Sequence, residues 1–178
     1  LSNGGKISGA TSATLQIANT ADSDEGAYRC VVTNPYGNAT SNTATLTVIN
    51  PPSITQHPAN QTVAAGATAG FTVAATGDPT LAYQWQKNSV NLSNGGRISG
   101  ATTTNLQIAT AVDADEGNYR CVVTNAGGSA TSNVATLTVN TPPTITQHPA
   151  NQAVPSGGTA TFTVAATGDP TLTYQWQK

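Results

Sequence analysis

The stretch "DEGNYRCVVTN" at residues 115–125 decides the fold of this chain, and a near copy, "DEGAYRCVVTN", occupies residues 24–34. Within the first stretch, Tyr119, Cys121 and Val123 alternate with residues of the opposite face. Alternation with a period of two is typical of a strand that buries one face. The sequence therefore predicts a half-buried strand that occurs twice.

The two copies belong to a longer repeat with a period of 91 residues. "LSNGGKISGAT" begins at Leu1 and "LSNGGRISGAT" at Leu92, while "YQWQK" begins at Tyr83 and again at Tyr174. A fixed period indicates an array of similar units, and this length suits a small β domain. We expect three parts: the C-terminal half of a domain at 1–50, a complete domain at 51–141, and the N-terminal half of a further domain at 142–178.

Other segments show the same alternation, so an all-β fold is predicted. They include "TAGFTVAAT" at 68–76, "LAYQWQK" at 81–87, "TNLQIAT" at 104–110 and "VATLTVN" at 134–140. Clusters rich in glycine and asparagine, such as "SNGG" and "NAGGS", separate them as turns do. No helix is predicted beyond a turn near "AVDADEG".

Composition restricts the classes of function. The chain has 178 residues, a net charge of -2 and only 8% charged residues, against about 25% in typical soluble domains. So few basic residues exclude a nucleic-acid footprint or an acidic membrane surface as partner. No apolar run approaches the roughly 20 residues of a membrane span. The chain shows no signal peptide and does not begin with methionine, so we expect an internal segment of a longer protein.

The order of the motifs resembles the immunoglobulin fold, and most closely its intermediate (I-set) type, which occurs in tandem arrays. The resemblance rests on the lone tryptophan of "YQWQK", the pattern D-x-G-x-Y-x-C, and the proline-led "PPSITQHPANQTVAAG" from Pro51. The amino-acid sequence of the repeat most resembles the Ig-like repeats of large bacterial surface proteins. It implies β-sandwiches in tandem, with Trp85 on strand C in the core and Tyr119 in a tyrosine corner. It also implies strands C′ or D to G in 1–50 and strands A to C in 142–178.

The cysteines depart from that family's pattern. Cys30 and Cys121 are the only two, and strand B carries Val73, or Val164 in the last repeat, where the family has a cysteine. The resemblance therefore implies domains that lack the disulfide between strands B and F. We expect the cysteines to be buried small hydrophobic side chains, with a free thiol for intermolecular bonding as the alternative. The predicted core positions are Trp85, Tyr119, Cys121, Val73, Tyr28, Cys30, Val164 and Trp176.

Two charged residues are assigned to the structure of the domain. Arg97 and Asp115 resemble a buried ion pair of this family that joins strand D to the E–F turn, and Lys6 replaces arginine in the first copy. The acidic run "DADE" at 113–116 is weighed as a calcium site, because hard cations take clustered oxygen ligands. We set it aside because Asp115 is already assigned to the ion pair.

The sequence offers little chemistry for catalysis. His57 and His148 are the only histidines, and one per repeat cannot form a multi-histidine metal site within a domain. Nucleophilic catalysis needs a base beside the nucleophile, and no motif of that kind is present. We therefore expect no enzyme activity, no metal and no cofactor.

These observations predict a non-enzymatic array of Ig-like domains, outside the cell or at its surface, that acts as a stalk, surface fibre or adhesive scaffold. Neither 1–50 nor 142–178 can bury its apolar face alone. We therefore expect neighbouring domains or head-to-tail chains as partners, which would give a filament. The alternative is a carbohydrate- or ligand-binding module of a secreted multidomain protein. Such a module would want a cluster of exposed aromatic residues, and only Tyr36 stands outside the core positions.

Overall fold

Strand β15 (Gly117–Asn125) is the centre of the fold and covers most of the stretch "DEGNYRCVVTN". On one side it pairs with β11 (Ala82–Lys87), which places Trp85 opposite Cys121. On the other side it pairs with β17 (Ala135–Asn140) and with β16 (Gly128–Thr131). Alternate residues of β15 are buried, as the period of two predicts.

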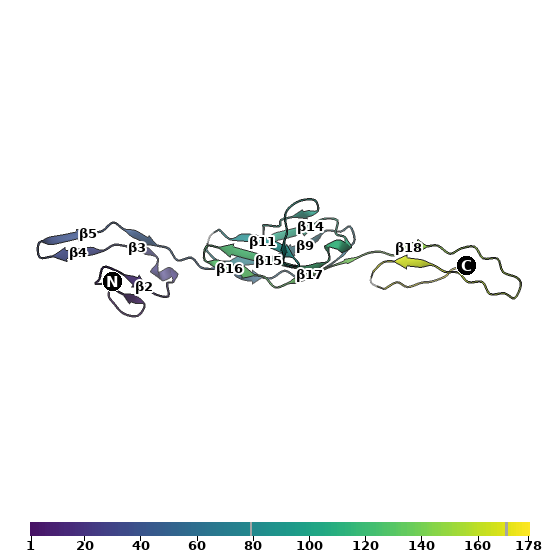
Figure 1. Ribbon diagram of the computed structural model, residues 1–178, viewed down its shortest axis with the longest axis horizontal. Helices are drawn as coiled ribbons and strands as arrows, with labels where there is room; N and C mark the ends of the chain where they lie inside the picture. Colours follow the sequence, from purple (N-terminus) through teal and green to yellow (C-terminus); the bar gives the residue numbers. More distant parts are fainter. Residues whose placement is uncertain (79, 170) are drawn as a thin grey trace. The chain divides into compact units, whose positions relative to one another are not determined.

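The computed structural model describes residues 1–78, 80–169 and 171–178, and the chain divides into two compact units, Leu1–Asn50 and Pro51–Lys178 (Figure 1). We call Leu1–Asn50 the first unit. Within the second unit, residues 51–141 form the central sandwich and residues 142–178 the C-terminal segment.

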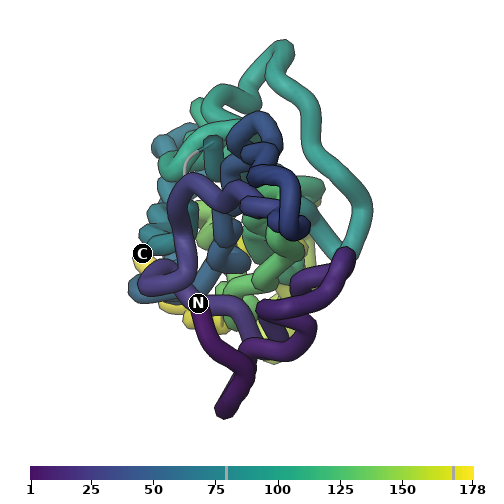
Figure 2. The backbone as a smooth tube through the Cα atoms, turned by 90° about the vertical axis from the view of Figure 1, so that its left-hand side faces the viewer, coloured from purple at the N-terminus to yellow at the C-terminus, as the bar shows by residue number. Residues whose placement is uncertain are grey.

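Two sheets enclose the core of the central sandwich, so the all-β immunoglobulin-like fold class is confirmed. The first sheet has the order β12-β11-β15-β17-β8, and the second β13-β14-β9, with β10 and β7 paired beside them. Figure 2 shows the teal connection between β11 and the β13–β14 hairpin standing away from the packed strands. The remaining elements are β7 (Ser53–Gln56), β8 (Gln61–Ala64), β9 (Ala69–Thr72), β10 (Ala74–Thr76), β12 (Val90–Asn91), β13 (Ile98–Ser99), β14 (Asn105–Ile108) and the 3-10 turn η2 (Asp113–Asp115).

The chain enters and leaves the central sandwich at opposite ends. At the entrance, Pro52 packs so closely on Gly77 that a β-carbon at Gly77 would lie 3.1 Å from the Cα of Pro52. At the exit, the carbonyl of Asn140 accepts a hydrogen bond from the Ala65 amide at 2.9 Å. The entrance thus lies beside the β10–β11 turn, and the exit beside the β8–β9 turn.

The first unit forms three two-stranded ribbons and lacks a second sheet to close over them. The ribbons are β1–β2, β3–β6 and β4–β5. Among its residues none is buried in an apolar core, and Leu15, Val31 and Val32 are exposed. The elements are β1 (Ile7–Ser8), β2 (Gln16–Ile17), the 3-10 turn η1 (Asp22–Asp24), β3 (Gly26–Tyr28), β4 (Val31–Asn34), β5 (Gly37–Thr40) and β6 (Ala44–Leu46).

The C-terminal segment repeats the first part of the central sandwich. Its strands β18 (Thr144–Gln147) and β19 (Ala165–Thr167) pair as β7 and β10 do, with the same irregularity in register. The rings of Phe162 and Trp176 lie 6.2 Å apart, and the equivalent rings in the central sandwich lie 6.1 Å apart. The segment therefore keeps the arrangement of its core side chains without a sheet to cover them.

Candidate functional site

An aromatic cluster holds the central sandwich together at the positions singled out in the sequence. Trp85 is fully buried, and its Nε1 donates a hydrogen bond to the carbonyl of Thr103 at 2.9 Å. The ring of Phe71 stacks on Tyr119, with centroids 4.8 Å apart. Aromatic pairs at such separations add about 0.5–1.5 kcal/mol beyond their burial. Val73 and Cys121 are buried in the same cluster.

Tyr119 makes the hydrogen bond expected of a tyrosine corner. Its hydroxyl donates to the carbonyl of Asp115 at 2.6 Å. Burial, and then the nearby charge of Asp115, raises the pKa of Tyr119 to about 12, so the hydroxyl keeps its proton as a donor. Tyr28 makes the same bond to Asp24 at 2.5 Å in the first unit. The corner is therefore local and forms without the opposing sheet.

Arg97 and Asp115 form an ion pair that fastens β13 to the η2 turn. The guanidinium contacts both carboxylate oxygens, with Nη2 to Oδ1 at 3.0 Å, and the Val112 amide donates to Oδ2 at 2.9 Å. Burial raises the pKa of Asp115, but the hydrogen bonds from Arg97 and Val112 outweigh it, so the pKa lies below its usual range. Both carboxylate oxygens of Asp115 are therefore already bound within the domain, by Arg97 and by the Val112 amide.

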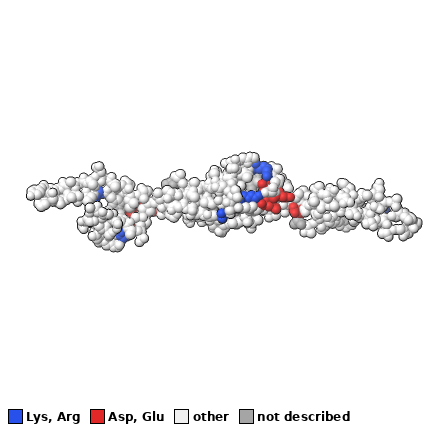
Figure 3. All heavy atoms as spheres, viewed as in Figure 1, with Lys and Arg blue, Asp and Glu red and all other residues white. Residues whose placement is uncertain are grey.

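The equivalent ion pair of the first unit fixes the orientation of its two side chains less strictly. Lys6 contacts Asp24 through a single ammonium group, and the hydrogen bond from that group is the first cause that lowers the pKa of Asp24. An ammonium cannot make the two-pronged contact of a guanidinium. Figure 3 shows most charged atoms of the visible face gathered near η2 of the central sandwich.

The thiol of Cys121 is suited to packing and poorly suited to chemistry. It is free and fully buried, and burial raises its pKa to about 11. A thiol is a nucleophile only as its thiolate, so Cys121 is inert at neutral pH. Its backbone amide donates to the hydroxyl of Ser132 at 2.9 Å, which fixes the strand where β16 gives way to β17.

The structure differs from the sequence prediction at four of the eight core positions. Cys30 is exposed, Tyr28 and Val164 are half-buried, and the Trp176 side chain is 52% exposed. The cause is the same for all four: each lies outside the central sandwich, and no second sheet among the described residues covers it as one covers Tyr119, Cys121, Val73 and Trp85. Equivalent sequence positions therefore have different burial.

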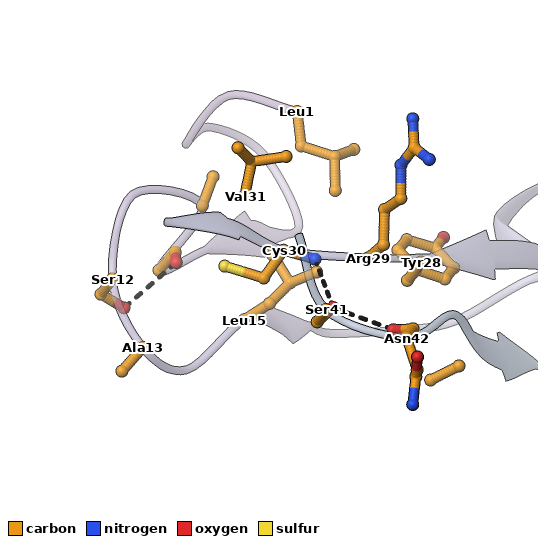
Figure 4. A pocket seen from close by; sticks show the side chains of 13 residues that line it. Leu1, Ser12, Ala13, Leu15, Tyr28, Arg29, Cys30, Val31, Ser41 and Asn42 are labelled. Atoms are coloured by element: carbon orange, nitrogen blue, oxygen red, sulfur yellow. Dashed lines mark hydrogen bonds between the residues drawn. The ribbon is translucent and has the colours of Figure 1, made fainter. Parts of the chain in front are cut away.

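A hollow of about 350 Å³ marks the uncovered face of the first unit. Figure 4 shows Leu1, Leu15, Cys30 and Val31 around it, with the Cys30 amide hydrogen-bonded to the Ser41 hydroxyl. A second hollow of about 290 Å³, in the C-terminal segment, is lined by Ile145, Val164, Tyr174 and Trp176, with Thr173 and Gln175. Several of these lining residues, namely Leu1, Leu15 and Cys30 in the first hollow and Ile145, Val164, Tyr174 and Trp176 in the second, have equivalents that belong to the buried core of the central sandwich or pack against it.

One structural role of the "HPAN" motif was missed in the sequence. The Nδ1 of His57 accepts a hydrogen bond from the Asn133 amide at 3.0 Å, and Oδ1 of Asn60 accepts one from the Thr136 amide at 2.8 Å. The two side chains fasten the segment between β7 and β8 to the last strand. The exact repetition of this motif was the available signal, but sequence alone does not show which amides it meets.

The described part of the chain was also compared with the requirements of a metal site and of a membrane-spanning helix. It contains no group of three or more histidine, cysteine or acidic residues placed to hold a metal ion. None of its helices has the length and apolar character required to cross a bilayer.

Comparison with known proteins identifies the fold family. The sequence matches the family model of the immunoglobulin I-set domain at residues 4–48 and 52–139. The chain also resembles a titin I-band fragment, I67–I69, with a TM-score of 0.71 and 22% identity, over 84% of this chain and 54% of that one. It resembles extracellular domains 3–5 of Drosophila OTK with a TM-score of 0.62 and 26% identity, over 75% of this chain and 46% of that one.

Relatives in sequence come from animals and from a bacterium. Roundabout homolog 2 of Homo sapiens is 37% identical over 164 residues, and protein sax-3 of Caenorhabditis elegans is 36% identical over 156, or 92% and 88% of this chain. Endoglucanase C of Cellulomonas fimi is 41% identical over 128 residues, or 71% of this chain. The chain spans only 12%, 12% and 11% of the lengths of these three proteins.

Proposed function

The chain belongs to the immunoglobulin I-set family, and from this premise we propose that it is part of a non-enzymatic array of Ig-like domains outside the cell or at its surface. The array acts as a stalk, surface fibre or adhesive scaffold. Residues 1–50, 51–141 and 142–178 are then a half, a whole and a half domain. Its partners are the neighbouring Ig-like domains of the same array.

The observation that carries this proposal is the self-contained core of the central sandwich. Phe71, Trp85 and Tyr119 close it by packing, and no disulfide is found among the described residues. Proline pairs at the linkers, Pro51–Pro52 and Pro142–Pro143, restrict the backbone between repeats. A unit that folds on its own core and is joined by stiff connections suits a spacer.

The relatives support an extracellular place for the array. The OTK fragment it resembles is named as extracellular domains. We propose a bacterial source, because the Cellulomonas relative shares the highest identity of the three described above, and the missing disulfide suits repeats that do not depend on an oxidising compartment.

Antibody labelling of intact cells tests the location and the role. An antibody raised against residues 1–178 is expected to stain unpermeabilised cells of the source organism, and brief protease treatment should remove the signal. A cytoplasmic protein serves as the control for lysis. Staining that requires permeabilised cells would exclude the surface array.

The second candidate is a carbohydrate- or ligand-binding module of a secreted multidomain protein, and the match to an endoglucanase favours it. Tyr36 is 97% exposed in the β4–β5 turn of the first unit, but its counterpart Gly127 has no side chain. Sedimentation of the chain with insoluble cellulose and xylan separates the two functions. The array proposal expects less than about a tenth of the protein in the pellet. Saturable binding that Tyr36→Ala abolishes would establish the module instead.

A further inference from the structure

The residues "HPAN" at 57–60, which we call the HPAN segment, lead from β7, which pairs with β10, to β8 in the larger sheet. The Asn133 amide, just before β17, donates to Nδ1 of His57 at 3.0 Å. The Thr136 amide, within β17, donates to Oδ1 of Asn60 at 2.8 Å. Between these two side chains, Pro58 is buried and its ring fixes the backbone angle φ. The segment is therefore fastened by two acceptors of different chemistry.

The two acceptors differ in their response to acid. The Nδ1 of an imidazole accepts a hydrogen bond only while it carries no proton, so the bond from Asn133 requires a neutral His57 with its proton on Nε2. The amide oxygen of Asn60 carries no such condition. Histidine is the side chain that ordinarily changes its charge between pH 5 and pH 8. Mild acid should therefore break the first bond and leave the second.

The surroundings of His57 offer a protonated ring no acidic partner. His57 is exposed, so water reaches its ring, and β7, β8, β10, β16 and β17 contain no ionisable side chain. The adjoining strand β15 carries Tyr119 and Cys121, which are buried, and Arg120. The Nε of Arg120 donates to Gln86 of β11 at 2.8 Å. Among the described residues no carboxylate forms an ion pair with His57, so protonation removes one bond without supplying another.

We propose that His57 is a pH-sensitive fastener of the central sandwich. The neutral ring ties the start of the HPAN segment to the chain just before β17. In mild acid the ring releases that end, while Asn60 stays bound to Thr136 and β8 stays paired with β17 from Gln61 onward. Acid should therefore loosen the crossing from β7 to β8 without opening the larger sheet. The device belongs to the single domain and does not depend on the proposed array.

Unfolding of the full chain by urea at two pH values tests the fastener, with tryptophan fluorescence as the readout. At pH 7.5, His57→Ala should raise the unfolding equilibrium constant of the central sandwich about fivefold, which is the effect of one hydrogen bond. At pH 5.0 the wild type has already lost that bond, so the same change should raise the constant less than about twofold. Equal factors at the two pH values would overturn the proposal.

Two matched controls separate the fastener from a general effect of substitution. Asn60→Ala removes the acceptor that does not titrate, so it should raise the unfolding constant by the same factor at both pH values. His148→Ala removes the equivalent histidine of the C-terminal segment and should leave the unfolding of the central sandwich unchanged at both. A pH-dependent effect of either control as large as that of His57→Ala would contradict the assignment to His57.

His57→Asn separates the acceptor from the proton. Asparagine places an amide oxygen near the position of the imidazole Nδ1 and does not titrate in this range. The variant should unfold like the wild type at pH 7.5, and its unfolding constant should be about fivefold lower than that of the wild type at pH 5.0. A variant whose stability falls with pH in parallel with the wild type would show that His57 is not the titrating group.

Nuclear magnetic resonance of the wild-type chain observes the bond directly. At pH 7.5 the nitrogen chemical shifts of the His57 ring should be those of a bare Nδ1 and a protonated Nε2. As the pH is lowered to 5.0, the Asn133 amide signal should move together with the ring signals, while the Thr136 amide signal stays in place. A neutral ring protonated at Nδ1, or equal responses of the two amides, would exclude the fastener. Neither result bears on the cell-surface test of the array.

Discussion

At the scale of single residues, burial separates Cys121 from Cys30 although both occupy the same place in the repeat. Cys121 lies under a complete second sheet and its pKa rises to about 11, whereas Cys30 faces a hollow. The same contrast holds for Trp85 and Trp176. Local sequence sets which face of a strand is apolar, but only the rest of the domain buries it.

Tyr119→Phe is expected to destabilise the central sandwich by about 1–2 kcal/mol. The change removes the hydrogen bond to the Asp115 carbonyl and leaves that acceptor unpaired beside the core. Urea unfolding of the full chain, followed by tryptophan fluorescence, measures the loss. Tyr83→Phe, at a half-buried position, is the control and should cost much less; equal losses would show that the corner contributes nothing specific.

Val73→Cys is expected to restore the disulfide that the family pattern carries between strands B and F. Val73 and Cys121 belong to one buried cluster, and a bridge between them would raise the free energy of unfolding by about 2–4 kcal/mol under oxidising conditions. Unfolding with and without dithiothreitol isolates the contribution of the bond. No gain in the oxidised form would show that the two side chains do not meet.

Asp115→Asn is expected to remove a pH dependence from stability. The folded pKa of Asp115 lies below its unfolded value, so its contribution is complete above about pH 4 and is lost as the pH falls through the folded pKa. Unfolding free energies measured between pH 7 and pH 2 should therefore fall less steeply for the variant than for the wild type. Asp113→Asn, at an exposed position, is the comparison, and an identical slope for both variants would contradict the assignment.

The sequence predicted the core of 51–141 well because its evidence is local. Alternation predicted strands where β11 and β15 lie, and the resemblance to the immunoglobulin fold predicted that Trp85 is buried in the core. The predicted burial of Tyr28, Cys30, Val164 and Trp176 was wrong, because burial depends on covering strands that local sequence does not reveal. Hydrogen bonds such as the one that the Asn133 amide donates to His57 could not be predicted from the sequence either, because they join residues 76 positions apart.

At the scale of elements, the hairpin of β13 and β14 depends on one glycine. Gly100 has a φ of +75°, and a β-carbon there would lie 1.8 Å from the carbonyl oxygen of Asn105. Backbone conformation and space both require glycine at this turn, which sets the register of Ile98 opposite Ile108.

Gly100→Ala should therefore cost well over the roughly 1 kcal/mol of conformational strain alone, because the turn has to open to relieve the clash. Gly66→Ala is a matched control, since Gly66 also has a positive φ, +85°, but open space around it. Thermal unfolding monitored by circular dichroism compares them. Equal changes in Tm would mean that the turn adapts to the methyl group at no added cost.

At the scale of the whole molecule, stability is expected to be uneven along the chain. The apolar core of described residues lies entirely within 51–141. At dilution, the amides of β11 and β15 should exchange with solvent at least about a hundredfold more slowly than those of β3 and β6. Hydrogen exchange with mass spectrometry measures this, and a concentrated sample gives the comparison. Uniform protection at dilution would contradict this prediction, because it would mean that the amides of residues 1–50 are shielded from solvent as well as those of the central sandwich.

The pairing of β8 with β17 decides how an array of these domains would carry load. These strands run parallel over four residue pairs, from Gln61 with Leu137 to Ala64 with Asn140. Tension applied through the entrance and the exit pulls the two strands past each other along their length. Their hydrogen bonds would then be strained together in shear and could not open one after another like a zipper. A tethered surface protein built from such domains would yield abruptly, one domain at a time.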